Sequence, residues 1–400
     1  MPAGSTLVAD APAGRHLRSR GVGRVQPTTT AELFFDLVYV FAVTQLSHQI
    51  LDDLSVAGVA RAAFLLLVVW WAWISTTWMS NWFDPASPTV RAVLTGVMLA
   101  SLLMAAAIPG AFAGDSLLFA AGYVALQVGR NAAAACVLPH GHPLRDVFGR
   151  LVVWSALPGV LWLAGGVLDG DRRLTLWLLA LALELAAPAA GYWRPGRGRT
   201  ATTDYDVEGG HFAERCQLFI IIALGESIVV TGATASAAGL NPTVLLCLVL
   251  AFAGTAALSL LYFGATSEIA HVAMTRSEDP GRLARDAYTY LHLPIVAGII
   301  ATAVGNDLLI AHPLEPLDGV GAAMLLAGPA LYLLGENLFR GRMSGPLKAE
   351  RLTAAVLLLA LLPLGTRLSA LLLSAVVATV LTALAVVELR TRRHRAAAVH

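Results

Sequence analysis

Apolar runs of about 20 residues follow one another along almost the whole chain, separated by short breaks rich in Arg, Asp, Pro and Gly. A helix of about 20 residues crosses the roughly 30 Å hydrocarbon layer of a membrane, whereas a transmembrane barrel would show shorter alternating segments. The pattern predicts an all-α, polytopic membrane helix bundle of about twelve transmembrane helices. They are expected near residues 30–51, 57–79, 89–108, 116–138, 147–168, 174–193, 211–232, 242–264, 287–306, 319–339, 349–366 and 368–389.

The composition agrees with this interpretation. Of the 400 residues, 57% are hydrophobic and 13% are charged, against about 25% charged in a typical soluble domain. The short breaks leave no room for a soluble domain, so residues 28–390 are expected to form one integral membrane domain. Residues 1–27 contain arginines but no apolar core, which excludes a cleavable signal peptide and favours a flexible cytoplasmic tail. Residues 391–400 are expected to be a basic cytoplasmic tail.

The placement of Arg and Lys predicts how the chain crosses the membrane, because cytoplasmic loops retain these residues. With the N-terminus inside, 21 of the 27 fall in cytoplasmic segments, and Arg130 and Arg215 fall within helices. A miscount by one helix would destroy this division. We therefore expect a multi-pass plasma membrane protein with both termini in the cytoplasm. Membrane lipids are its expected partners. The net charge of +1 gives no indication of nucleic acid binding. The oligomeric state stays open.

Two segments of similar sequence suggest an internal repeat. A Gly-x6-Gly pattern in the fourth run ends in Arg130-Asn131, and the same pattern in the tenth run ends in Glu336-Asn337. An offset of six helices preserves orientation, as in the parallel repeats of several transporter folds, with halves at residues 28–200 and 205–390. Arg130 and Glu336 could then form an ion pair across the bundle. Such a pair could equally serve only to hold the helices together.

The most informative polar residues are two carboxylates in the first apolar run. Glu32 and Asp36 are one turn apart and share a face of the predicted helix. A charge in hydrocarbon costs a few kcal/mol, so such residues usually face a protein interior or a wet cavity and mark a site. Near the helix start, Glu32 could equally be a solvated or N-capping carboxylate. Asp36 could equally belong to a buried ion pair that fixes helix packing.

The seventh run carries a second polar group. Glu214 and Arg215 lie near its start, and Glu226 lies about 18 Å beyond Glu214 by helical rise. Arg215 is the natural counter-charge for Asp36 or Glu32. The candidate ion- or proton-binding residues are Glu32, Asp36, Glu214, Arg215 and Glu226, with Arg130, Asn131, His211, His292, Glu336 and Asn337 as secondary candidates.

Other features add packing rather than chemistry. Gly225 and Gly232 lie on one edge of the seventh run, which favours close approach of a neighbouring helix. The Trp-rich segment 70–84 is expected to anchor at the membrane interface, or else to form an aromatic wall around a ligand. No phosphate loop, dinucleotide fingerprint, nucleophile elbow or metal-ligand cluster is present, so we expect no cofactor and no metal.

Four blocks of the sequence are distinctive, namely ELFFDLVYVFA at 32–42, WWAW at 70–73, ERCQLFIIIALGES at 214–227 and HLPIVAGI at 292–299. They resemble those of the bacterial low-temperature-requirement A family. The likeness extends from about residue 28 to 390, and the first and third blocks are the specific ones. The resemblance implies a polytopic inner-membrane protein named for a growth phenotype, with no agreed substrate, reaction or catalytic residue. Cys216 departs from the family pattern, which argues against an essential thiol. The positions that the family marks correspond to Glu32, Asp36, Glu214, Arg215, Gly225 and Glu226.

Three classes of membrane protein fit these residues. A secondary transporter or ion- or proton-coupled permease for a small ion or solute is favoured, because two parallel halves would each begin with a carboxylate-bearing helix. An intramembrane enzyme acting on a lipid or prenyl substrate is the less favoured alternative, since paired carboxyls suffice for acid–base chemistry. A structural or sensory protein, in which ion pairs only hold helices together, is the third.

Overall fold

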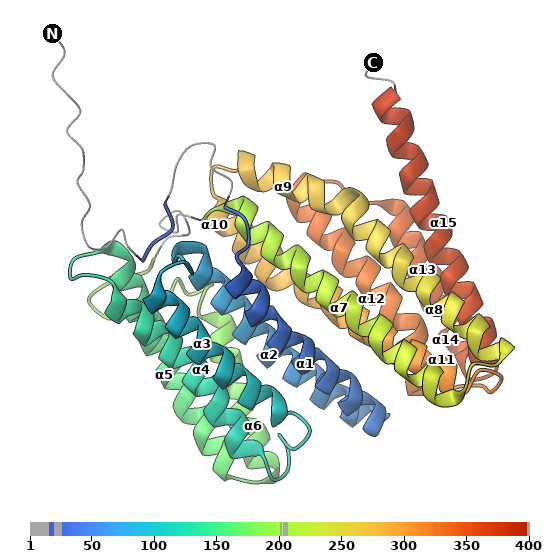
Figure 1. Ribbon diagram of the computed structural model, residues 1–400, viewed down its shortest axis with the longest axis horizontal. Coiled ribbons are helices and arrows are strands. Elements are labelled where there is room, and N and C mark those ends of the chain that lie inside the picture. Colours follow the sequence, from blue (N-terminus) through green and yellow to red (C-terminus); the bar gives the residue numbers. More distant parts are fainter. Residues whose placement is uncertain (1–15, 20–25, 201, 203–206, 398–400) are drawn as a thin grey trace. The chain divides into compact units, whose positions relative to one another are not determined.

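The computed structural model describes residues 16–19, 26–200, 202 and 207–397 (Figure 1). Over these residues the chain is a helix bundle without β-strands, which confirms the all-α membrane fold class. Most of the predicted N-terminal tail, 1–27, lies outside the described residues. The last helix, α15 (Ala370–Ala397), continues into the predicted C-terminal tail, of which residues 398–400 lie outside the described part.

Within the described residues, nine helical stretches are long and apolar enough to cross a membrane. They are Thr30–Asp52, Val56–Trp82, Pro88–Ala106, Pro143–Val167, Gly209–Ala238, Pro242–Arg276, Pro280–Ala311, Gly319–Ser344 and Ala370–Thr391. The other three predicted spans fall on shorter or more polar elements, namely α4 (Ser116–Val137), α6 (Gly170–Ala186), and α13 (Ala349–Ala360) with α14 (Leu362–Gly365). The count of twelve spans and the internal repeat therefore stay predictions.

The chain forms two compact units that share the first two helices, α1 (Thr30–Asp52) and α2 (Val56–Trp82). The first unit falls within residues 1–35 and 74–206, and the second within 36–73 and 207–400. The hairpin formed by the larger parts of α1 and α2 thus belongs with the C-terminal half of the chain.

The remaining helices of the first unit pack in sequence order. They are α3 (Pro88–Ala106), α4, α5 (Pro143–Val167) and α6, and each packs against the next (Figure 1). The turn before α5 shows how the sequence starts a helix. Pro143 occupies the first turn, where its missing N–H is no loss, and the His142 ring accepts a hydrogen bond from the Leu144 N–H at 3.2 Å.

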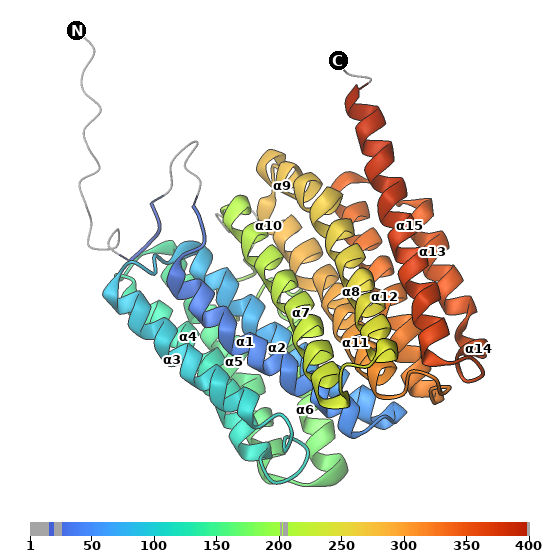
Figure 2. The ribbon, with the colours of Figure 1, turned by 45° about the vertical axis from the view of Figure 1, so that its right-hand side comes forward.

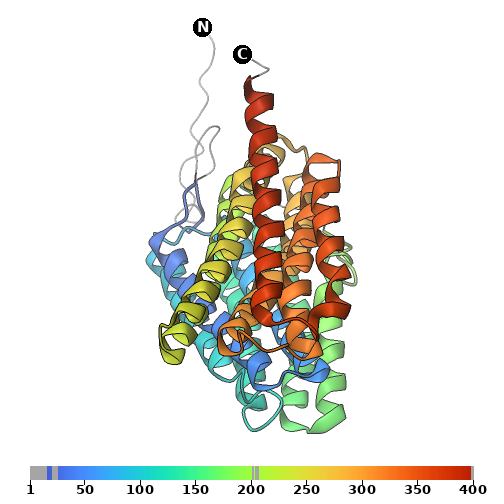
Figure 3. The ribbon, with the colours of Figure 1, turned by 90° about the vertical axis from the view of Figure 1, so that its right-hand side faces the viewer.

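The second unit contains the remaining helices, of which the long ones lie side by side in Figure 2. They are α7 (Gly209–Ala238), α8 (Pro242–Leu261), α9 (Ser267–Arg276), α10 (Pro280–Leu283), α11 (His292–Ala311), α12 (Gly319–Ser344), α13, α14 and α15. Two π-helical segments interrupt them, η3 (Tyr262–Thr266) after α8 and η4 (Ala284–Leu291) before α11. Figure 3 shows the C-terminal end of α15 extending past its neighbours in this unit.

Polar side chains begin the long helices of the second unit. Asn241 accepts a hydrogen bond from the Val244 N–H at 3.0 Å at the start of α8, and Asp318 accepts one from the Gly321 N–H at 2.6 Å at the start of α12. Each cap satisfies a backbone donor that has no partner inside its helix. The apolar runs therefore begin as helices close to the predicted positions.

Glycines set the closest helix contact of the second unit, between α11 and α12. A Cβ added at Gly298 would lie 2.4 Å from the backbone nitrogen of Tyr332, and one at Gly305 would lie 2.6 Å from the Cα of Leu325. The expectation of close approach at Gly225 and Gly232 is wrong, because within the described structure a Cβ at either position meets no atom within 4 Å. Small residues allow such contacts, but the packing decides where they occur.

Candidate functional site

Asp36 and Arg215 form a buried ion pair in the second unit. Asp36 lies on α1 and Arg215 lies near the start of α7, and neither side chain is more than 3% exposed. The guanidinium donates from Nη1 to Oδ2 at 2.5 Å and from Nη2 to Oδ1 at 2.7 Å. Paired donors of this kind make the strong, bidentate form of Arg–carboxylate contact. Of the two carboxylates that the sequence offered as partners for Arg215, the structure selects Asp36.

Aromatic side chains enclose this ion pair. Trp73 of α2 donates from Nε1 to Asp36 Oδ1 at 2.8 Å, and its ring lies 5.7 Å from the Cζ of Arg215. The Phe219 ring, one turn after Arg215, lies 4.4 Å from the Trp73 ring. Interfacial anchoring is the wrong interpretation for Trp70 and Trp73, which are at most 2% exposed. Their indole N–H groups instead bond inside the second unit, that of Trp70 to a backbone carbonyl of η4.

Glu32 has its own partners, in the first unit. Arg18 donates to Glu32 Oε2 at 2.8 Å, and Thr29 donates to the same oxygen from its backbone N–H and its hydroxyl, each at 2.9 Å. The Glu32 N–H returns a bond to the Thr29 hydroxyl at 3.4 Å. Glu32 therefore serves as the carboxylate of a capping box at the start of α1. Sequence reasoning missed Arg18, because nothing in an apolar pattern signals a tail residue that folds back.

Glu226 is buried without an ionic partner. It lies in the middle of α7 and is 2% exposed, and its Oε2 lies within hydrogen-bond distance, 2.7 Å, of the Thr44 hydroxyl oxygen of α1. Its Oε1 has no hydrogen-bond partner among the described residues, and no ion pair to Glu226 is found there. The Thr44 hydroxyl also lies 3.1 Å from the Val40 carbonyl, one turn back along α1. Glu226 thus differs sharply from Asp36, whose charge is matched.

Hydroxyl groups continue the polar character of α7 beyond Glu226. The Ser227 hydroxyl lies 3.2 Å from that of Thr255 on α8. Thr231 bonds the Ser227 carbonyl, and Thr234 donates to Asp307 of α11. One helix therefore carries an arginine, a carboxylate and several hydroxyls toward neighbouring helices of its unit.

Two further candidates lie at the start of α7. His211 is 1% exposed, and Glu214 is partly buried. Glu208 caps this end, since its carboxylate accepts from the N–H groups of Gly210 at 3.1 Å and His211 at 2.5 Å. Both candidates thus belong to the same end of the helix as Arg215.

A second buried charge network lies elsewhere in the second unit. Arg351 of α13 contacts Glu336 of α12 at 2.6 Å and Glu388 of α15 at 2.6 and 2.9 Å. The Thr266 hydroxyl of η3 donates to the other oxygen of Glu336 at 2.5 Å, and Arg340 lies 3.6 Å from Glu388. Sequence reasoning missed Arg351 and Glu388. It counted Arg351 among the Arg and Lys residues of cytoplasmic segments, and it gave Glu388, at the end of the last apolar run, no role.

The suggested partner of Glu336, Arg130, belongs to a polar chain in the first unit. Arg130 donates to Gln127 at 2.5 Å, Gln127 donates to the Tyr123 hydroxyl at 3.0 Å, and Tyr123 donates to Glu184 at 2.5 Å. These contacts link α4 to α6. A pairing of Arg130 with Glu336 would join different units and stays a prediction.

The other secondary candidates are also buried. Asn131 donates to Ser155 of α5 at 3.4 Å, a long contact. His292 Nε2 lies 2.7 Å from the Tyr262 hydroxyl, so the ring at the start of α11 meets a residue of η3. Asn337 exchanges two hydrogen bonds with the backbone of Lys348, at 2.8 and 3.0 Å, and so secures the turn between α12 and α13.

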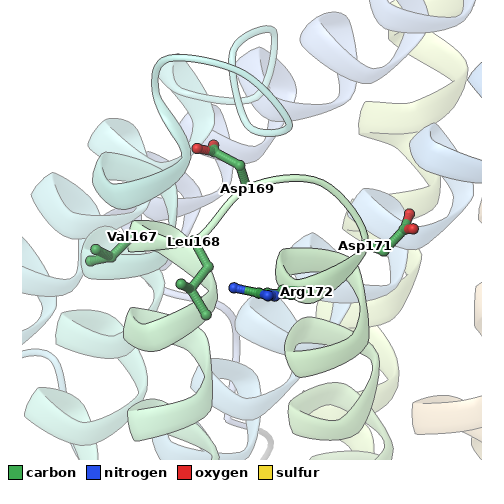
Figure 4. Close-up of a pocket in the computed structure, with 5 residues that line it drawn as sticks. All are labelled: Val167, Leu168, Asp169, Asp171 and Arg172. Atoms are coloured by element: carbon green, nitrogen blue, oxygen red, sulfur yellow. The ribbon is translucent and has the colours of Figure 1, made fainter.

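A pocket of about 450 Å³ opens in the first unit where α5 meets α6 (Figure 4). It is lined by Val167, Leu168, Asp169, Asp171 and Arg172. The Asp169 side chain is 94% exposed and pairs with Arg173 at 2.7 Å, so this is an open surface site without a predicted residue. In the part of the chain that the structure describes, no group of three or more His, Cys, Asp or Glu is placed to hold a metal ion.

Comparison with known proteins identifies a family and one similar protein. The family model described as "Bacterial low temperature requirement A protein (LtrA)" matches residues 27–386. The chain is 38% identical over 305 residues to a protein of Rhizobium meliloti (strain 1021) named "Uncharacterized protein RA0937", with 76% of this chain and 75% of that protein covered. No solved structure matches the chain.

Proposed function

From the premise that this chain belongs to the bacterial low temperature requirement A family, we propose that this multi-pass membrane protein is a secondary transporter or an ion- or proton-coupled permease. The observation that carries the proposal is Glu226. Its carboxyl group is buried in a candidate membrane span, and no ion pair to it is found among the described residues. A carboxylate that is costly to charge and is left unmatched is typical of ion and proton pathways.

The Asp36–Arg215 pair has a different role in this proposal. Its charges cancel, and its hydrogen bonds are already directed to each other and to Trp73. It joins α1 to α7 at one level, and the Thr44–Glu226 contact joins them about 12 to 17 Å further along, by helical rise. The pair therefore contributes to the packing of α1 against α7. Glu226 binds the transported charge.

Reconstitution tests the proposal. The purified protein in proteoliposomes should support flux driven by a proton or cation gradient, and Glu226→Gln should abolish it while the variant still folds. Glu350→Gln is the matched control, because Glu350 is an exposed glutamate at the start of α13. Unchanged flux in a folded Glu226→Gln variant would refute the proposal. A change in lipid composition without any gradient would favour an intramembrane enzyme instead.

A further inference from the structure

The hydrogen bonds around Glu226 identify the charge that it binds. We propose that Glu226 is a proton carrier. In the described conformation its proton is on Oε2 and forms a hydrogen bond to the Thr44 hydroxyl oxygen. This inference rests on the proposed function and narrows it, because it selects a proton over a metal cation as the coupling ion.

Counting hydrogens at Thr44 gives the argument. The Thr44 hydroxyl has one hydrogen to donate and can accept others. Its oxygen lies 2.7 Å from Glu226 Oε2 and 3.1 Å from the Val40 carbonyl oxygen. A carbonyl can only accept, so a bond to Val40 uses the Thr44 hydrogen. The bond to Glu226 then needs a hydrogen from the carboxyl group.

A protonated Glu226 satisfies this whole chain. The carboxylic acid donates to Thr44, and Thr44 donates to Val40, so each hydrogen has one acceptor. An ionised Glu226 would compete with Val40 for a single hydrogen, and both its oxygens would hold charge in a site that is 2% exposed. Burial of an unmatched charge is costly, whereas a neutral acid with a bonded hydroxyl is tolerated.

A bound metal cation fits the same geometry less well. The 2.7 Å separation of the Thr44 and Glu226 oxygens is an ordinary O–H···O distance, which places a hydrogen between them. A hard cation collects about six oxygen ligands. Oε1 is the oxygen of Glu226 left without a hydrogen-bond partner among the described residues.

Two titratable side chains lie on helices that contact α7. His48 lies on α1 one turn beyond Thr44 and is exposed. Asp307 of α11 accepts a hydrogen bond from Thr234, which lies about two turns beyond Glu226 on α7. Among the described residues no ion pair joins His48 to Glu226, in keeping with a neutral acid.

Infrared difference spectroscopy on the purified full-length protein in nanodiscs tests the assignment without any flux. At neutral pH, without Na⁺, the wild-type spectrum minus the Glu226→Gln spectrum should contain the carbonyl stretch of a protonated carboxylic acid. Thr44→Val should shift that band, because the acid loses its acceptor. Thr379→Val is the matched control, since Thr379 also bonds a carbonyl one turn back, at 2.7 Å, but is exposed on α15. It should leave the band in place.

The outcomes separate this inference from the proposed function. A difference spectrum without a protonated acid band would overturn the inference even if Glu226→Gln abolishes transport. A band that disappears on addition of Na⁺ at constant pH would overturn it in favour of a cation site. If the band is present and no gradient drives flux, the inference stands and the proposed function fails. If Glu226→Gln does not fold, the wild-type spectrum is compared directly with that of Thr44→Val. A difference spectrum without a shifted carboxylic acid band would then refute the inference.

Discussion

Replacing Asp36 by asparagine should destabilise the protein strongly, because it removes the carboxylate that pairs with the buried Arg215 guanidinium. The carboxylate accepts two hydrogen bonds from Arg215, at 2.5 and 2.7 Å, and one from Trp73 at 2.8 Å. Asparagine keeps one acceptor oxygen and loses the negative charge. Breaking a buried pair from one side costs about 3–5 kcal/mol.

Two comparisons turn this magnitude into a test. Asp53 pairs with Arg61 at the same 2.7 Å, but these side chains are 35% and 44% exposed, so Asp53→Asn should cost about 0–1 kcal/mol. Replacing both members of the buried pair, by Asp36→Leu with Arg215→Met, removes the stranded charge. The double variant should recover most of the loss, to within about 1–2 kcal/mol of wild type.

The assay is reversible unfolding of the purified protein in mixed micelles, with the free energy of unfolding compared across the four proteins. Adding the single variants Asp36→Leu and Arg215→Met completes a double-mutant cycle, which isolates the coupling between Asp36 and Arg215. A loss for Asp36→Asn no larger than that for Asp53→Asn would refute the reasoning, since it would mean that the buried pair contributes no more than an exposed one.

Three further predictions concern packing and the other polar networks. Gly298→Ala should lower the free energy of unfolding by about 1–3 kcal/mol, because the added methyl group pushes α11 away from α12. Gly254→Ala should change it little, since a Cβ there meets no described atom within 4 Å. Equal losses for the two variants would contradict the described packing of α11 against α12. Arg351→Met should cost about 3–5 kcal/mol, because it removes the arginine that pairs with buried Glu336 and with Glu388. Chemical denaturation measures this loss, and a loss below 1 kcal/mol would argue against the network. Tyr123→Phe removes the donor to Glu184 and should cost about 1–3 kcal/mol, and an unchanged unfolding midpoint would show that this bond adds nothing.

The helices could be predicted from the sequence because apolar length and flanking polar residues determine them. The run expected at 242–264, for example, begins at Pro242 under the Asn241 cap. What the sequence could not give is which helix faces which. Gly225 and Gly298 look alike in sequence, yet only the latter contacts a neighbouring backbone in the described structure.

The candidate site could be predicted in part. The cost of burying charge identified Asp36, Arg215 and Glu226 without any knowledge of packing. It could not distinguish Asp36 from Glu32 as the partner of Arg215, because the choice depends on Arg18, which returns from the N-terminal segment to Glu32. Nor could it separate a matched carboxylate from an unmatched one, which is the difference on which the proposed function depends.

The central claim is that Glu226, and not the Asp36–Arg215 pair, binds the transported charge. The most direct measurement compares proton flux into proteoliposomes for two folded variants, Glu226→Gln and the double variant Asp36→Leu with Arg215→Met, under the same imposed pH gradient. The account predicts that the double variant retains flux and that Glu226→Gln loses it. Flux that persists in Glu226→Gln and disappears in the double variant would contradict it.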